Sequence, residues 1–317
     1  MNRTVNILFL GGAKRVSLAR HLKSYGANRG LRVGIFSYEL DREVPIGIEG
    51  EVVKGLKWHD PKIMEDIEAC NAKYHIDIVL PFVDPAIEVA SRLKDAGSKV
   101  FIPVSGVEIC RTMFDKVLSS EWFSLHGIPQ PERYFSLEGI RYPAILKPRG
   151  GSASKGIIVA YKPADLYNID LSAYLIQEYV SDRTEYTVDC YVSKAGEPVS
   201  IVPRIRLETA GGEAVRTRTI RDGQIIGVSR KILSSCEFRG PVTIQFLRNN
   251  AGGELYVMEI NPRFGGGVIA SIEAGSRILD MLFAEFEGDV AALSDDWEEG
   301  MLMTRYFEEV IYHADSY

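Results

Sequence analysis

Three oxygen-bearing side chains near the end of the chain have the spacing of a metal site. Gln245 lies in the strand-like run 242–246, and Glu259 and Asn261 lie in a second run, 256–261, after a glycine-containing turn. Side chains two apart in a strand point to one face, and a hairpin can place Gln245 opposite Glu259. Carboxylate and amide oxygens suit Mg²⁺, a hard cation that shares its shell with waters and phosphates. The pattern therefore predicts a magnesium site.

Arg263 adds a cation directly after this hairpin, beyond a proline that ends the strand. A guanidinium at this place can neutralise charge on a transferred phosphoryl group. The alternative is a solvated hairpin face with an incidental acid and amide. Glu259 lies between Met258 and Ile260, where an unpaired carboxylate is costly, so we favour the metal site.

A long loop rich in small residues, 147–156, separates two further strand-like runs. It joins strand to strand and lacks the Walker A spacing, so it is not a P-loop. Small residues let backbone N–H groups approach phosphate oxygens, and such a loop can close over a nucleotide. Lys147 could reach an α- or β-phosphate. A simple hairpin turn is the alternative, although ten residues with three glycines and two lysines exceed what a turn needs.

The segment 177–180, with Glu185 after it, lies between this loop and the hairpin. A strand that passes from one lobe to another could offer backbone groups to an adenine edge, with Glu185 on the ribose hydroxyls. Acids at strand ends are common, so this interpretation depends on the position of the segment in the chain.

The turn Gly11-Gly12 follows the first strand-like run and invites a dinucleotide interpretation. The GxGxxG fingerprint is absent because Ala13-Lys14-Arg15 come next, so a plain tight turn is expected and an NAD-dependent dehydrogenase is disfavoured. Glu39 and Asp41, near the end of the second run, are expected to be solvated. A role in binding a second substrate is the alternative.

Size and composition indicate a soluble protein of two domains. The 317 residues exceed one ordinary core, and the four scattered cysteines form no CxxC pair, which is typical of a reducing compartment. A net charge of −6 without a basic run predicts no nucleic-acid partner. The lack of a long apolar run predicts no membrane span, so we expect a cytoplasmic protein. A homodimer is left open.

Strand and helix patterns alternate over residues 1–104, which predicts a doubly wound parallel sheet. The expected strands are 5–10, 32–37, 77–80 and 99–103, and the expected helices are 16–29, 60–74 and 84–96. A helix at 115–126 follows, and strand-like runs dominate beyond residue 142. The second domain, 105–317, is therefore expected to be α+β with antiparallel sheets, in a small lobe at about 115–180 and a large lobe at about 181–317. Helices around 226–234 and 269–287 would cover its sheets.

Taken in order, these segments resemble the ATP-grasp superfamily, in particular its carbamoyl-phosphate-synthase-like branch. The motifs are Asp115-Lys116, Tyr142–Pro148 with the glycine-rich loop, Gln177–Val180 with Glu185, Gln245, and Glu259–Arg263. The match runs roughly over 105–290, and the N-terminal region is similar to the pre-ATP-grasp domain of that family. The resemblance implies an α/β plus α+β fold, with a doubly wound parallel sheet followed by a two-lobed ATP-grasp domain.

The resemblance also implies a role for each matching residue. ATP would lie between antiparallel sheets, in contact with Lys116, Lys147, Ser152, Ser154, Gly156, Glu178, Tyr179, Val180 and Glu185. Gln245, Glu259 and Asn261 would bind one or two Mg²⁺ ions, or Mn²⁺. Arg263 would act with Glu259 and Asn261 in catalysis and steady the γ-phosphate and an acyl-phosphate intermediate.

The implied function is an ADP-forming ligase that activates a carboxylate as an acyl phosphate for attack by an amine or similar nucleophile. The alternative is an ATP-binding sensor or interaction protein without ligase turnover. The chain departs from carbamoyl phosphate synthase in having one ATP-grasp unit and in Phe264–Gly267, so the substrates stay open. Four arginines on neighbouring predicted strands could include a clamp for a substrate carboxylate or be exposed sheet residues: Arg204, Arg206, Arg216 and Arg218.

Overall fold

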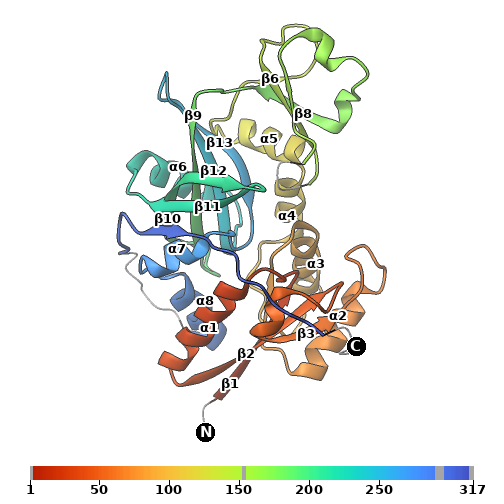
Figure 1. The fold of residues 1–317 in the computed structure, drawn as a ribbon, viewed down its shortest axis with the longest axis vertical. Helices are drawn as coiled ribbons and strands as arrows, with labels where there is room; N and C mark the ends of the chain where they lie inside the picture. The colour runs from red at the N-terminus through yellow and green to blue at the C-terminus, as the bar shows by residue number, and fades with distance from the viewer. Residues whose placement is uncertain (1–2, 152–154, 290–295, 314–317) are drawn as a thin grey trace.

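Three sheets succeed one another along the long axis of the molecule (Figure 1). The computed structural model describes residues 3–151, 155–289 and 296–313. The first sheet is parallel, with strand order β3-β2-β1-β4. The second and third sheets are antiparallel, with orders β13-β12-β9-β10-β11-β14 and β5-β8-β6-β7. The predicted fold class, a parallel sheet followed by antiparallel ones, is confirmed.

The N-terminal sheet has helices on both faces because its central strand is apolar on both sides. Its strands are β1 (Arg3–Leu10), β2 (Leu31–Glu39), β3 (Glu51–Lys54) and β4 (Ile78–Pro81), and its helices are α1 (Val16–Asn28), α2 (Ile63–Tyr74) and α3 (Asp84–Asp95). Successive side chains of β1 enter different cores. Ile7 and Phe9 pack with residues of α1, whereas Leu8 and Leu10 pack with residues of α2 and α3.

The strand expected at 99–103 is wrong: the structure has a single isolated bridge there, between Ile78 and Phe101. Pro103 has no backbone N–H to donate, so the ladder cannot extend through it. The segment still contributes side chains to the apolar core, since Ile102 and Val104 are buried.

The N-terminal domain and the large lobe share one apolar core. Phe264, Leu282 and Phe283 pack in the same cluster as Ile7 and Phe9. The helix expected over 269–287 is two helices, α7 (Val268–Glu273) and α8 (Ile278–Glu287). Gly275 has φ 89° just after the end of α7, which is the left-handed conformation that commonly ends a helix.

The large lobe is built on the six-stranded sheet. Its strands are β9 (Arg183–Val192), β10 (Pro198–Ala210), β11 (Glu213–Thr219), β12 (Gly240–Asn249), β13 (Leu255–Asn261) and β14 (Leu302–Thr304), and α6 (Gly223–Ser234) packs on it. After β14 the C-terminal segment, dark blue in Figure 1, crosses to the N-terminal domain. There Arg20 lies 3.5 Å from Glu308, and the Tyr312 hydroxyl donates to Val44 O at 2.6 Å.

The small lobe has a core of its own, which includes Tyr134, Leu146 and Ile176. Its sheet contains β5 (Arg133–Tyr134), β6 (Ala144–Pro148), β7 (Ile158–Ala160) and β8 (Tyr174–Glu178), and α4 (Val107–Phe114) and α5 (Lys116–Leu125) lead into it. Three short 3₁₀ helices complete the described elements: η1 (Pro45–Ile48), η2 (Pro163–Leu166) and η3 (Leu171–Ala173). The division of the chain at residue 104 stays a prediction.

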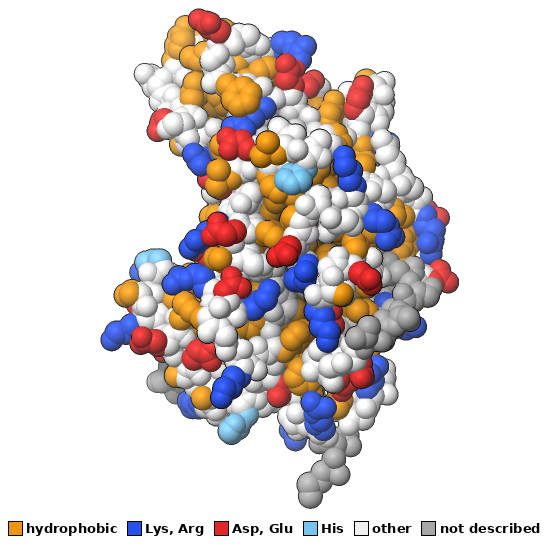
Figure 2. Space-filling view, turned by 180° about the vertical axis from the view of Figure 1, so that it is seen from behind, with side chains coloured by type: hydrophobic (Ala, Val, Ile, Leu, Met, Phe, Trp, Pro, Cys, Tyr) orange, Lys and Arg blue, Asp and Glu red, His pale blue; other side chains and the backbone are white. Residues whose placement is uncertain are grey.

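The face opposite to that of Figure 1 carries acidic and basic side chains interspersed (Figure 2). In the described part of the chain, every helix is too short or too polar to cross a bilayer. The expected lack of a nucleic-acid partner stays a prediction.

Candidate active site

The hairpin β12–β13 brings the three predicted metal ligands together. Gln245 pairs with Glu259 across the ladder, and Thr243 pairs with Asn261. The Gln245 side-chain amide donates to Glu259 Oε1 at 2.5 Å, and the Asn261 amide donates to the same oxygen at 2.9 Å. The hairpin and the shared face of these side chains agree with the prediction. Their role as metal ligands stays a prediction.

The chemistry of this set fits Mg²⁺. It offers one carboxylate and two amide groups, and hard cations prefer such oxygen ligands. Both amide nitrogens lie at one oxygen of Glu259, and turning an amide over exchanges its donor for an acceptor at nearly the same position. Among the described residues no group of three or more His, Cys, Asp and Glu side chains offers a metal site. That search leaves out amide ligands such as Gln245 and Asn261.

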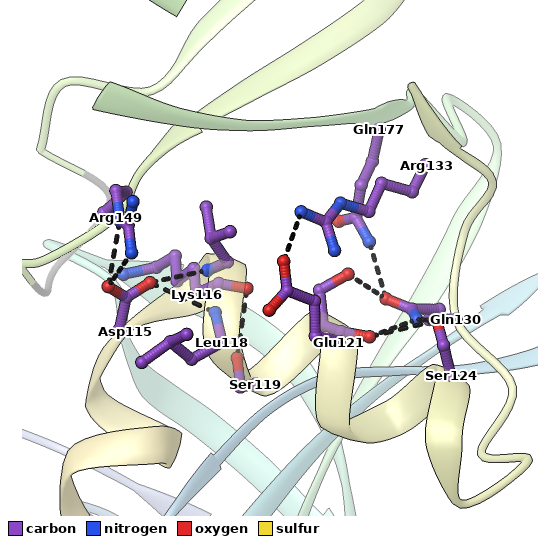
Figure 3. Close-up of polar contacts among 12 residues, drawn as sticks. Asp115, Lys116, Leu118, Ser119, Glu121, Ser124, Gln130, Arg133, Arg149 and Gln177 are labelled. Atoms are coloured by element: carbon purple, nitrogen blue, oxygen red, sulfur yellow. Dashed lines mark hydrogen bonds and ion pairs between the residues drawn. The ribbon is translucent and has the colours of Figure 1, made fainter. Parts of the chain in front are cut away.

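Lys147 lies at the end of β6 and is 7% exposed. Its ammonium donates to Gln177 Oε1 at 2.9 Å. The Gln177 amide nitrogen donates to Gln130 Oε1 at 3.2 Å, and Gln130 in turn accepts from Ser120 at 2.6 Å (Figure 3). This chain of hydrogen bonds turns the oxygen of Gln177 toward Lys147. Burial lowers the pKa of Lys147 to about 8, against the attraction of Glu259, which raises it.

We expect the affinity for ATP to fall as the pH rises through about 8. The free protein holds the Lys147 ammonium below this pH and the neutral amine above it, and a triphosphate favours the charged form. Each pH unit above this pKa then weakens binding by up to about tenfold. Calorimetric titrations from about pH 6.5 to about pH 9.5 measure the slope, with Lys147→Arg, which stays charged, as the control. Equal slopes in both proteins would contradict the assignment.

An apolar pocket adjoins Lys147 between the two lobes. It is lined by Pro131, Ile145, Lys147, Glu178, Tyr179, Val180, Arg183, Leu247 and Met258. Four of these residues were predicted to bind the nucleotide: Lys147, Glu178, Tyr179 and Val180. In the described part of the chain, the Val180 N–H makes no hydrogen bond to backbone or side chain. The pocket therefore has the apolar walls that a planar base needs, and the adenine contacts of these residues stay a prediction.

Sequence reasoning missed Arg183 and the apolar walls of this pocket. Arg183 Nε donates to Glu185 Oε1 at 3.0 Å, and its Nη1 donates to Val180 O at 2.8 Å. Arg206 Nε lies 3.8 Å from the other oxygen of Glu185. Glu185, which is predicted to bind the ribose, is thus held between two arginines. Ile145 was detectable, since it lies two residues before Lys147 in the same strand.

The start of α5 anchors the glycine-rich loop. Asp115 accepts from the N–H groups of Val117 and Leu118, and Arg149 donates to its Oδ2 at 2.7 and 2.9 Å (Figure 3). Burial raises the pKa of Asp115, but the bonds from Arg149 and the two N–H groups outweigh it and lower the pKa. Lys116 Nζ donates to Gly151 O at 2.8 Å.

Two of the loop residues predicted to bind phosphate, Ser152 and Ser154, lie outside the described residues. Gly156 is described and has φ 74°. Its place on the nucleotide stays a prediction, as does that of Lys116. Sequence reasoning missed the anchoring role of Asp115, although an Asp before a helix is a usual N-cap signal.

Arg263 lies between the hairpin and the N-terminal domain. Its Nη1 donates to Phe264 O at 3.0 Å, and its buried Nε has no hydrogen-bond partner among the described residues. Nε lies 3.8 Å from Oδ1 of Asp84, at the start of α3. Burial raises the pKa of Asp84 in spite of the attraction of Arg263. Asp84 was missed, although it follows the carboxyl end of β4, where such sheets bind ligands.

Arg204 does not have the exposure that a substrate clamp needs. It is 1% exposed, and Nε and Nη2 donate to the two oxygens of Asp189 at 2.7 and 3.2 Å. Asp189 Oδ2 also accepts from Ser271 at 2.6 Å. Arg206 lies closer to the hairpin, since its Nη1 donates to Gln245 Oε1 at 2.7 Å. Arg216 and Arg218 are exposed.

The glycine run 265–267 passes over this buried ion pair. A Cβ at Gly265 would lie 2.7 Å from Asp189 Oδ1, and a Cβ at Gly267 would lie 2.7 Å from Arg204 Nη1. Contacts this short exclude any larger residue unless the ion pair moves. The run 265–267 is therefore fitted to Asp189 and Arg204.

Asp189→Asn should destabilise the fold by about 3–5 kcal/mol, because it leaves the buried Arg204 without a counter-charge. The matched control is Asp296→Asn, which removes a carboxylate that is 87% exposed and 3.2 Å from Arg221. We expect that change to cost less than about 1 kcal/mol. Urea denaturation of both variants measures the difference. Similar losses of unfolding free energy in the two variants would show that the buried ion pair stabilises the fold no more than the exposed one.

The loop after β1 is occupied by a carboxylate of the protein itself. Glu39, predicted to be solvated, is 8% exposed, and its side chain accepts hydrogen bonds from the N–H groups of Gly12 and Ala13 and from Ser37. Burial raises its pKa against these bonds. The prediction for Glu39 was wrong because the N–H groups of the loop after β1 bind its carboxylate and bury it. The two N–H groups are used by Glu39, which agrees with the absence of a dinucleotide fingerprint.

Comparison with known proteins gives matches in sequence and in fold. The profile of the family described as ATP-grasp in the biosynthetic pathway with Ter operon matches residues 170–308. The carbamoyl phosphate synthase large chain of Methanobrevibacter smithii is 25% identical over 270 residues, a match that takes in 73% of this chain. The chain spans about a quarter (26%) of the length of that relative.

Three solved structures share the architecture. N5-carboxyaminoimidazole synthetase from Staphylococcus aureus, complexed with ADP, has a TM-score of 0.72 at 18% identity and covers 94% of this chain and 81% of its own. Biotin carboxylase from Campylobacter jejuni, also at 0.72, has 17% identity over 91% of this chain and 72% of its own. The biotin carboxylase domain dimer of Hydrogenobacter thermophilus 2-oxoglutarate carboxylase, with MgADP, has a TM-score of 0.70 at 16% identity and covers 92% of this chain and 71% of its own.

The chain has the ATP-grasp fold, and its resemblance to the ATP-grasp superfamily is confirmed. The match to a carbamoyl phosphate synthase agrees with the branch that the motifs indicated.

Proposed function

We propose that this protein is an ATP- and Mg²⁺-dependent, ADP-forming ligase. It activates a carboxylate as an acyl phosphate, which an amine or similar nucleophile then attacks. The observation that supports this most is the hairpin β12–β13, where the amides of Gln245 and Asn261 both bond to one carboxylate, Glu259. Beside the larger effects of burial, the charge of Glu259 also acts to raise the pKa of Lys147 in the small lobe and of Asp84 in the N-terminal domain.

Each part of the proposed site has a distinct task. The apolar pocket takes the adenine, and Lys147 meets the phosphates. Gln245, Glu259 and Asn261 hold Mg²⁺, which would neutralise charge on the transferred phosphoryl group. Arg263, with a buried Nε free of hydrogen bonds among the described residues, is suited to a γ-phosphate oxygen.

The proposed reaction has two steps. An oxygen of the substrate carboxylate attacks the γ-phosphorus, and ADP leaves. The nucleophile then attacks the acyl carbon, and inorganic phosphate leaves. The positive charge of Lys147 and Arg263 stabilises the charge that develops on the phosphoryl oxygens in the first step.

Hydroxylamine tests this proposal without knowledge of the natural nucleophile. It traps acyl phosphates as hydroxamates, so a panel of carboxylates can be screened with MgATP by hydroxamate colour and by ADP release. We expect at least one carboxylate to raise both signals together. Tight ATP binding with no carboxylate that raises either signal would instead support the alternative, an ATP-binding sensor or interaction protein.

The other features assigned with this function remain part of the proposal. They are one or two Mg²⁺ ions with Mn²⁺ as a substitute, small-molecule carboxylate and amine substrates, and a cytoplasmic location. A monomer and a homodimer are both compatible with the proposal.

A further inference from the structure

Two arginines from distant parts of the chain meet at one carboxylate, Glu213, close to the segment that follows Arg263. Arg15, at the start of α1, lies 3.6 Å from Glu213 of β11. Arg305, just after β14, forms an ion pair and hydrogen bond with the same carboxylate. Arg263 also acts on Glu213 by its charge. Burial raises the pKa of Glu213, but the three guanidiniums outweigh it and lower the pKa.

The backbone of Gly266 forms the floor of this cluster. A Cβ there would lie 3.0 Å from Glu213 Oε2 and 3.1 Å from Arg15 Nη1, and Arg305 donates to Gly266 O. The glycine thus keeps side-chain atoms out of the space between Arg15 and Glu213.

The cluster has more positive than negative charge. Arg15 and Arg305 face Glu213, and Arg263 faces the second carboxylate, Asp84, at 3.8 Å, so three guanidiniums share two carboxylates. The Arg15 side chain is 14% exposed and lies over the ring of Phe82 at 5.8 Å, where burial lowers its pKa to about 10. Buried guanidiniums without matching anions are costly, and a carboxylate or phosphate relieves that cost through paired hydrogen bonds.

We propose that Arg15 and Arg305 bind a second anionic group of the carboxylate substrate, so that this substrate carries at least two negative groups. The inference rests on the proposed function and names the substrate class for the same site. One carboxylate meets Arg263 and is phosphorylated. The other group, a carboxylate or a phosphate, lies at Arg15 and Arg305. Gly266, which contacts the cluster, lies three residues after Arg263 in the chain, so one small molecule can reach from one place to the other.

Binding of model anions to the full-length protein in the presence of MgADP tests this directly. The probes are acetate, succinate and glycerol 3-phosphate, measured by calorimetry at fixed ionic strength. We expect succinate or glycerol 3-phosphate to bind at least about tenfold more tightly than acetate. Succinate as the tighter ligand assigns a carboxylate as the second anionic group, and glycerol 3-phosphate as the tighter ligand assigns a phosphate at that place.

Arg15→Met should remove this preference, weakening the favoured dianion by at least about tenfold while leaving MgADP affinity unchanged. The matched control is Arg29→Met at the other end of α1, about 20 Å away along the helix. Arg29 pairs only with Tyr25 and Glu287 among the described residues. Its loss should therefore change neither the affinity for the dianion nor the affinity for MgADP. Thermal unfolding of both variants checks the fold, and Arg15→Lys should restore part of the affinity.

Two results would overturn the inference: dianions that bind no better than acetate to the wild-type protein, or Arg15→Met binding them as tightly as the wild type. Neither result bears on phosphoryl transfer. Conversely, a carboxylate panel without hydroxamate would overturn the ligase proposal even where dianion binding depends on Arg15.

Discussion

Glu259→Gln is expected to abolish carboxylate-dependent ADP release, with a fall of about 10³-fold or more. The substitution keeps the size of the side chain and can still accept the hydrogen bonds from Gln245 and Asn261. It removes the one charged group of the proposed metal set. The rate of ADP release and the yield of hydroxamate at saturating MgATP measure the loss.

The control for this variant is Glu254→Gln, in the turn of the same hairpin, where the side chain accepts from Asn249 at 3.0 Å. Both proteins should unfold at nearly the same temperature, and the control should keep its activity. A near-normal rate for Glu259→Gln would sink the assignment of the metal site.

Lys147→Ala should weaken the binding of MgATP about tenfold to a hundredfold, because a hydrogen bond to a charged group contributes about 1.5–3 kcal/mol. The loss should be greatest below pH 8, where Lys147 is charged in the free protein. Fluorescent-nucleotide displacement measures the dissociation constant.

Two further variants separate charge from packing at this position. Lys147→Met keeps most of the volume of the buried side chain and should lose as much affinity as Lys147→Ala. Lys162→Ala removes an exposed lysine from the same lobe and should bind ATP normally. Unchanged ATP affinity in both Lys147 variants would rule out a phosphate contact.

The hairpin β12–β13 was predictable because its geometry depends on local rules. The alternation of side chains in β13 places Glu259 and Asn261 on one face, and the short turn after β12 brings Gln245 opposite. The doubly wound sheet was predictable for the same reason, since alternating strand and helix periods are written into consecutive residues. The predicted helix boundaries were wrong where a single residue ends a helix. Gly275, between α7 and α8, is the example.

The residues that sequence reasoning missed come from distant segments. Asp84 lies beside Arg263, and Arg15 and Arg305 lie beside Glu213, through packing between domains that no local period encodes. Glu39 was misjudged because the N–H groups that bind it belong to another strand end. Arg204 seemed free for a substrate since its partner, Asp189, lies on the neighbouring strand of the sheet.

The core that the N-terminal sheet shares with α7 and α8 makes these two regions inseparable. A chain cut at residue 104 would leave Phe264, Val268, Leu282 and Phe283 without the N-terminal residues of their core and exposed to water. Exposed patches of that kind drive aggregation. The N-terminal domain therefore completes the apolar core of the large lobe, and it also contributes Arg15 and Asp84. The small lobe has an apolar core of its own, so its packing does not depend on the N-terminal sheet.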